Sequence, residues 1–143
     1  MTLERLKEVF PHRERYPGEI DGGAPEVFDY QRDFYSRPWL EIEDDVIDYH
    51  DDVFSFMAEE ALRFYFPCYL KRAIADPSSP AATAFLSFFC SDRSVSVFSV
   101  FTRAQKLLCA EVAATSYEAT KQDWTIGCER LMATVEKIRN ETA

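Results

Sequence analysis

Apolar residues recur along this chain mostly at every third or fourth position, which is the spacing of one face of an α-helix. Stretches that alternate strictly between apolar and polar residues, as half-buried strands do, are few. On this basis the sequence predicts helices over residues 3–10, 25–35, 41–53, 57–76, 81–90, 97–117 and 121–139. We therefore expect an all-α bundle of five to seven helices, in one domain that spans residues 1–143.

Proline and glycine mark the breaks between these helices. The stretch 11–24 is rich in both and is predicted to be a loop or an arm. Pro67 falls inside the predicted helix 57–76, where it removes the hydrogen bond to the carbonyl of Arg63, so we expect a kink or a split there. Residues 91–96 are expected to form a turn, although Val95, Val97, Phe98 and Val100 could also form a strand.

The last predicted helix has a regular apolar face. Its members step by four, three, four and three residues: Trp124, Cys128, Leu131, Val135 and Ile138. This spacing predicts that the face packs against the core.

Charge is concentrated at one end of the sequence. Residues 1–56 hold 15 acids and 6 bases, whereas residues 57–143 hold 10 of each, so the whole net charge of −9 belongs to the first part. The densest stretch is 41–52, with seven carboxylates in twelve positions. A pI near 4.7 argues against partners that are nucleic acids or anionic membranes, because those attract basic surfaces.

The acidic stretch can be drawn as one amphipathic helix. Its apolar positions fall at helical spacing: Ile42, Val46, Tyr49 and Val53. A neighbouring face carries a column of carboxylates: Glu41, Asp45, Asp48 and Asp52. Like charges one turn apart cost a few tenths of a kcal/mol per pair, so this column suggests use, although many acidic runs are only solvated helix faces.

The use that fits such a column is docking of a basic protein, since one-sided charge speeds encounter with an oppositely charged partner. The predicted partner-binding residues are Glu41, Asp44, Asp45, Asp48, Asp51 and Asp52, with Trp39 and Tyr49 as aromatic anchors. Phe54 is a further candidate anchor, and the arginine-rich arm 12–16 could add contacts.

The stretch from Glu60 to Leu70, EALRFYFPCYL, resembles a motif E-A-(F/L)-R-Y-Y-L-P-A-Y-L of a small uncharacterised bacterial family. That family has a Trp upstream and a Gln in a later helix, positions that Trp39 and Gln105 could fill. Phe66 and Cys68 depart from the family's Leu and Ala. The resemblance implies a helical fold and no catalytic residue. Some similar small proteins lie near secreted-toxin genes as candidate immunity proteins.

The sequence gives few indications of catalytic, metal-binding or anion-binding residues. His12 and His50 are the two residues that titrate near neutral pH unaided, and either could pair with an acid, but surface or capping histidines are the plainer interpretation. Residues 48–52 offer carboxylates and an imidazole for a metal, without a calcium-loop or His-Glu-x-x-His pattern. Arg63 could bind an anion, but we expect it to pair with a nearby glutamate. We therefore assign no catalytic residue, metal or cofactor.

The four cysteines are spaced by roughly twenty residues, without the close pairs that zinc sites favour. Cys68, Cys90, Cys109 and Cys128 are predicted to be buried, reduced thiols. The first residues mix charges and lack the apolar stretch of a signal peptide, and no run is long enough to span a membrane. The sequence thus favours a cytoplasmic protein.

Three functions follow as hypotheses. The leading one is a small acidic binding protein, in its most concrete form an immunity-type inhibitor that occludes a basic toxin. The second is a structural or regulatory helical subunit that forms a homo-oligomer. The third is a hydrolase or metal-dependent enzyme that uses His50 and nearby carboxylates.

Overall fold

The computed structural model describes residues 3–10, 27–34, 37–121 and 129–142, and every regular element in these ranges is helical. The predicted all-α class is thereby confirmed. The α-helices are α1 (Leu3–Val9), α2 (Val27–Phe34), α3 (Asp44–Tyr49), α4 (Val53–Phe56), α5 (Glu59–Ala75), α6 (Pro80–Phe89), α7 (Arg93–Phe98), α8 (Arg103–Thr120) and α9 (Glu129–Thr142). A short 3₁₀ helix, η1, covers Trp39–Glu41.

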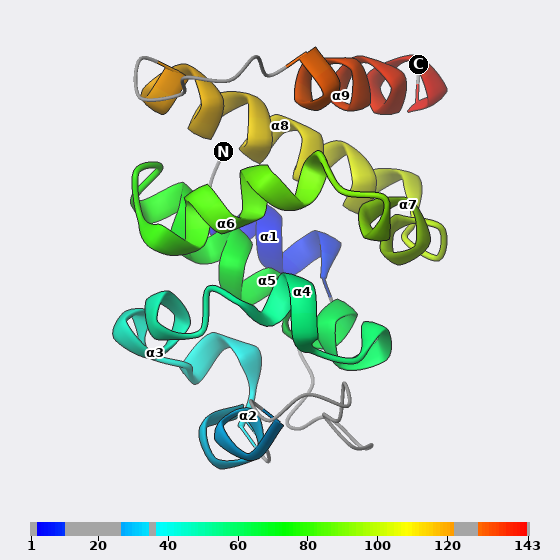
Figure 1. Ribbon diagram of the computed structural model, residues 1–143. Helices are drawn as coiled ribbons and strands as arrows, with labels where there is room; N and C mark the ends of the chain where they lie inside the picture. The colour runs from blue at the N-terminus through cyan, green and yellow to red at the C-terminus, as the bar shows by residue number, and fades with distance from the viewer. Residues whose placement is uncertain (1–2, 11–26, 35–36, 122–128, 143) are drawn as a thin grey trace.

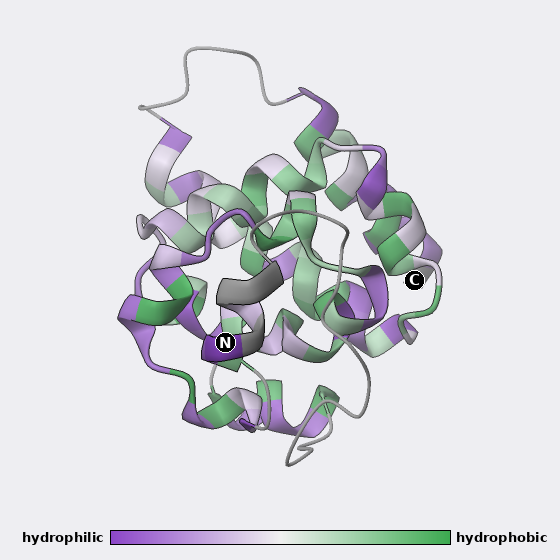
Figure 2. Cartoon of the chain, turned by 60° about the horizontal axis from the view of Figure 1, so that its bottom comes forward, coloured by the Kyte–Doolittle hydropathy of each residue, from purple (hydrophilic) through white to green (hydrophobic). Residues whose placement is uncertain are grey.

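The helices are stacked from one end of the molecule to the other. Figure 1 shows α8 and α9 at one end, α2 and α3 at the opposite end, and α1, α5 and α6 between them. Figure 2 shows green and purple positions mixed within the outer helices, as expected for elements that bury one face. Among the described residues, no helix combines the length and the apolar character needed to cross a membrane.

The central helix α5 is buried on most of its surface and contacts α1, α3, α6, α7, α8 and η1. It runs from Glu59 to Ala75 through Pro67, so the helix is not split at this proline, and the kink that we gave as the alternative stays a prediction. A proline inside a helix costs about 3 kcal/mol. Phe66, Cys68 and Leu70 are fully buried around it, and burial of one large apolar side chain alone contributes about 1.5–3 kcal/mol. Packing therefore offsets the cost of the proline.

Phe66 of α5 also organises the aromatic core. Five phenylalanine rings surround it with centroids 5.4–5.9 Å away: Phe54, Phe85, Phe88, Phe98 and Phe101. Four of these five contacts are edge-to-face, the geometry that aromatic quadrupoles favour. The high phenylalanine content thus serves the interior, where these rings link α4, α6 and α7 to α5.

The region after α6 differs from the prediction. Residues 93–98 form α7, where we predicted a turn and considered a strand, and the long helix begins at Arg103 rather than near residue 97. Thr102 explains this start: its side chain accepts a hydrogen bond from the Gln105 amide, and the Gln105 side chain accepts one from the Thr102 amide. This reciprocal capping box fixes a helix N-terminus.

The ends of the chain match the predicted pattern in part. Leu6 of α1 and Phe10, which follows it, are buried as expected, whereas Leu3 is exposed. In α9 the predicted apolar face is confirmed at Leu131, Val135 and Ile138, all of them buried. The other two members of that face and the predicted loop 11–24 lie outside the described residues.

The C-terminal carbonyls of short helices in this fold accept hydrogen bonds from cationic side chains of other elements. The Arg93 guanidinium donates to the carbonyl oxygens of Phe54 and Met57, at the C-terminus of α4. Arg63 donates to the carbonyl of Val97, 3.0 Å away, at the end of α7. The last carbonyls of a helix lack partners within it and carry partial negative charge, so a cation there stabilises the end.

The same arrangement recurs around η1. Arg37 donates to the carbonyls of Asp33 and Glu41, both at 3.0 Å, and so joins the ends of α2 and η1. Lys71 of α5 donates to the carbonyl of Ile42 at 3.1 Å. These side chains hold elements of only a few residues in place, because helices this short are not stable alone.

Candidate functional site

The acidic segment, where the sequence placed its candidate site, does not form one helix. It divides into η1, α3 and α4, separated by the extended residues Ile42 and Glu43 and by a turn over residues 50–52. The prediction of a single helix is therefore wrong, and so is the column that it implied: Glu41, Asp45, Asp48 and Asp52.

The buried residues of this segment differ from the predicted set. They do not follow the predicted apolar face, since Val46 is half-buried and Tyr49 is 68% exposed. The side chains that do enter the core are Trp39, Ile42, Ile47, His50, Val53 and Phe54. At about 100° per residue, a straight helix would carry these six positions within an arc of about 140°, so burial alone gives no reason for the two breaks.

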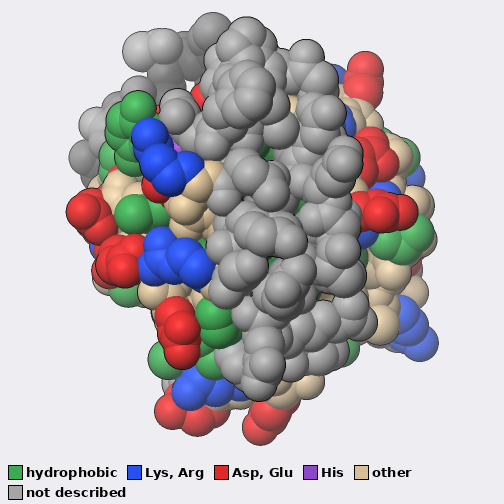
Figure 3. Space-filling model, turned by 90° about the horizontal axis from the view of Figure 1, so that it is seen from below, with side chains coloured by type: hydrophobic (Ala, Val, Ile, Leu, Met, Phe, Trp, Pro, Cys, Tyr) green, Lys and Arg blue, Asp and Glu red, His purple; other side chains and the backbone are tan. Residues whose placement is uncertain are grey.

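Several of the carboxylates are already paired. Glu43 lies 2.6 Å from Arg37. Asp48 receives Arg72 through both Nε and Nη2, at 3.1 and 2.9 Å, and Asp44 lies 3.7 Å from the same guanidinium. Figure 3 shows this end of the molecule, with acidic side chains beside Lys and Arg side chains. The local charge is therefore lower than the sequence suggests.

Four carboxylates are not paired in this way. Within the described part of the chain, Glu41, Asp45, Asp51 and Asp52 have no salt bridge, and Asp52 instead accepts a hydrogen bond from the Tyr30 hydroxyl at 2.8 Å. Partial burial, together with the charges of Asp52 and Asp48, raises the pKa of the Asp51 carboxyl. Asp51 also lines a hollow of about 360 Å³ beside α4 and α6.

The aromatic candidates differ in exposure. Trp39 is 1% exposed and Phe54 is 5% exposed, so the prediction that these rings anchor a partner at the surface is wrong. Trp39 belongs to the interior, where its carbonyl accepts a hydrogen bond from the Cys68 thiol. Tyr49 stands on the surface one helical turn after Asp45. We call Asp45, Tyr49 and Asp51 the Tyr49 surface.

His50 is buried, so the expectation of a surface histidine is wrong, although it does occupy the C-cap of α3. Its Nε2 lies 2.6 Å from Oδ2 of Asp33, and its ring packs against Phe34 at 5.2 Å. The hydrogen bond from Arg32, and secondarily that from His50, outweigh burial and lower the pKa of Asp33 to about 2.

This surrounding gives His50 a structural role. The ring is 3% exposed and the backbone carbonyl accepts a 2.6 Å hydrogen bond from Tyr69. An enzyme that uses His50 stays a prediction, but the ring would have to be uncovered before it could reach a substrate. His12 lies outside the described residues, and among those described no three His, Cys, Asp or Glu side chains are grouped to hold a metal ion.

The motif from Glu60 to Leu70 builds the interior rather than a surface site. Arg63 lies 3.3 Å from Glu59, which confirms the expected pairing, and its Nε and Nη2 also donate to carbonyls of α7. Gln105 donates to the carbonyl of Val9 and so ties α8 to α1.

The buried, reduced thiols that we predicted are confirmed at two of the described cysteines. Cys68 and Cys109 are buried and free, whereas Cys90 is half-buried, so its predicted burial is wrong. Burial raises the pKa of the Cys68 thiol to about 12. Cys128 lies outside the described residues.

Comparisons of the chain with protein-family models, with curated proteins and with solved structures find no match.

Proposed function

We propose that this protein is a binding module that docks a basic protein segment on the Tyr49 surface. The observation that carries the proposal is Tyr49 itself, a large ring that is 68% exposed on α3 with unpaired carboxylates before and after it. Tyrosine is enriched among residues that dominate protein interfaces, because it offers a broad apolar face with little conformational entropy to lose.

The neighbouring charges support a basic partner. Asp45 and Asp51 have no described cation to neutralise them, so an incoming Lys or Arg would not have to displace an existing ion pair. The hollow beside Asp51 is lined also by Phe54, Phe88 and Arg93, so it offers room for one apolar side chain of such a partner. An immunity-type inhibitor that covers a basic toxin is the most specific form of this function.

The test is affinity capture from the native cell, with mass spectrometry at low and high salt. We expect wild-type protein to retain one basic protein that leaves as salt rises, because exposed charge pairs are screened. Asp45→Lys with Asp51→Lys, and separately Tyr49→Ala, should lose it. The matched control reverses two exposed acids of α1, Glu4→Lys with Glu8→Lys, and should keep the partner.

Circular dichroism would show that each variant is folded. Capture that is equal for wild type and all variants, or recovery of no basic protein at all, would contradict the proposal.

Self-association is the second candidate function, and one observation favours it. Val95 and Val100 are exposed at 68% and 63%, near the start and just after the end of α7. A homo-oligomer that covers them should show a mass that grows with protein concentration in sedimentation measurements, and Val95→Lys with Val100→Lys should restore a monomer. A constant monomer mass at high concentration would exclude this alternative.

A further inference from the structure

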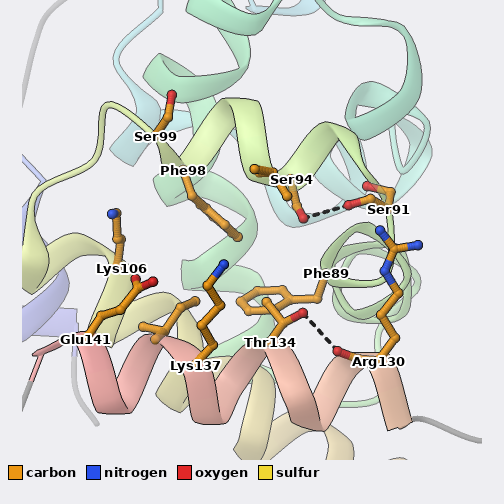
Figure 4. Close-up of a pocket in the computed structure, with 12 residues that line it drawn as sticks. Phe89, Ser91, Ser94, Phe98, Ser99, Lys106, Arg130, Thr134, Lys137 and Glu141 are labelled. Atoms are coloured by element: carbon orange, nitrogen blue, oxygen red, sulfur yellow. Dashed lines mark hydrogen bonds between the residues drawn. The ribbon is translucent and has the colours of Figure 1, made fainter.

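A groove of about 250 Å³ lies between α7 and α9 (Figures 1 and 4). Its apolar wall is formed by Phe89, Phe98 and Ile138, which are 1%, 6% and 5% exposed. These rings and the isoleucine are already packed, so the groove keeps its shape without a ligand. Ligand sites are usually largely preformed and lined by apolar and aromatic side chains in this way.

Cationic side chains surround this wall. Lys106, Arg130 and Lys137 line the groove, and Glu141 contributes a negative charge. Figure 4 shows Lys137 reaching from α9 toward the space between α9 and α7. Within the described part of the chain, neither lysine forms a salt bridge, whereas Arg130 pairs with Asp92. The groove is therefore a positive site on a protein whose net charge is −9.

The neutral polar groups of the groove are largely committed to the backbone. The Ser94 hydroxyl donates to the carbonyl of Ser91 at 2.7 Å, and the Thr134 hydroxyl donates to the carbonyl of Arg130 at 2.8 Å. The two ammonium groups thus remain as donors that are not used by the fold. A carboxylate is their natural complement, because hydrogen bonds between ionised partners are roughly twice as strong as neutral ones.

From this arrangement we propose that the groove binds a small amphiphilic carboxylate. Its alkyl or aryl body lies against Phe89, Phe98 and Ile138, and its carboxylate meets Lys137 and Lys106. The volume is slightly below the usual range of ligand pockets, about 300–1,000 Å³, which points to a short body rather than a long chain or a folded peptide. The proposal is independent of the Tyr49 surface.

The probe is octanoate, added below its micelle-forming concentration to isotopically labelled protein and followed by amide NMR shifts. We expect saturable shifts at Val95, Phe98 and Ile138. Acetate has the charge without the body, and octan-1-ol has the body without the charge. Each should bind at least about tenfold more weakly, and each methylene removed from octanoate should weaken binding roughly fourfold.

Lys137→Gln tests the charged contact, and Lys121→Gln is its matched control. Both lysines are exposed, and Lys121 lies about 22 Å along α8 from Lys106, at about 1.5 Å per residue. We expect Lys137→Gln to weaken octanoate binding at least fivefold and Lys121→Gln to leave it unchanged. Equal binding of octan-1-ol, shifts that map away from the groove, or an unaltered Lys137→Gln would each overturn the proposal.

Discussion

At the scale of single residues, tyrosine hydroxyls connect the parts of the acidic end. Tyr30 donates to Asp52 at 2.8 Å, and Tyr65 donates to the carbonyl of Phe34, also at 2.8 Å. A hydropathy pattern treats these residues as apolar and indeed places Tyr65 in the core. The pattern cannot show which group accepts the hydrogen bond from each hydroxyl, because the acceptors lie 22 and 31 residues away in sequence. A buried hydroxyl without an acceptor would cost about 1–3 kcal/mol, so these bonds select one packing of α2 and α5.

Asp33 offers a prediction at this scale. Its folded pKa of about 2 is below the ordinary value of 3.8, so its carboxylate form stabilises the folded state. This contribution is complete above about pH 4 and is lost as the pH falls toward 2. We expect Asp33→Asn to lower the free energy of unfolding by about 1–2 kcal/mol at pH 7, and the deficit to shrink below pH 4.

Urea unfolding at several pH values measures this deficit. Asp45→Asn is the matched control, because Asp45 is exposed and has no salt bridge among the described residues, and it should change stability little. A deficit for Asp33→Asn that is the same at pH 3 and pH 7 would contradict the role of the carboxylate.

At the scale of elements, the longer helices could be predicted and the short ones could not. α5 and α6 were placed within about two residues at each end, since their apolar residues recur at helical spacing. α3, α4 and α7 have six residues or fewer, too few to show a period or to be stable alone. Their ends depend on cations from other elements, which a local pattern does not contain. The start of α8 was an exception that could have been found, because Thr102 and Gln105 have the spacing of a capping box.

Arg93 tests how far such a cation holds a short helix. It is half-buried, burial lowers its pKa, and its guanidinium satisfies carbonyls at the end of α4. Arg93→Met keeps the stem but leaves those carbonyls without a donor, so we expect a loss of about 2–4 kcal/mol in thermal or denaturant unfolding. Arg130→Met removes only an exposed ion pair and should cost less than about 1 kcal/mol. Similar losses in the two variants would argue against the capping role.

At the scale of the whole molecule, the sequence showed the excess of acid but not its distribution in space. The acidic end is in part neutralised by Arg37 and by Arg72, and only the folded chain brings Arg72 to Asp48. The positive groove between α7 and α9 was missed entirely, because Lys106 and Lys137 are 31 positions apart in a region of balanced charge. The sequence also did not predict which aromatic side chains are exposed. It placed Tyr49 on the apolar face and Trp39 at the surface, whereas Tyr49 is exposed and Trp39 is buried.

Asp51 links the stability of the whole molecule to the proposed function. Its folded pKa is raised, by partial burial first and then by Asp52 and Asp48, so its ionised form opposes folding at neutral pH. The protein keeps a carboxylate there at a cost in stability, as functional sites often do. We expect Asp51→Asn to raise the melting temperature at pH 7. Because the wild-type carboxyl becomes neutral as the pH falls through its raised pKa, the gain should then disappear. The same variant should capture less of the basic partner. A variant that is no more stable at pH 7, or that is more stable and binds as well as wild type, would show that Asp51 is not a residue kept for binding.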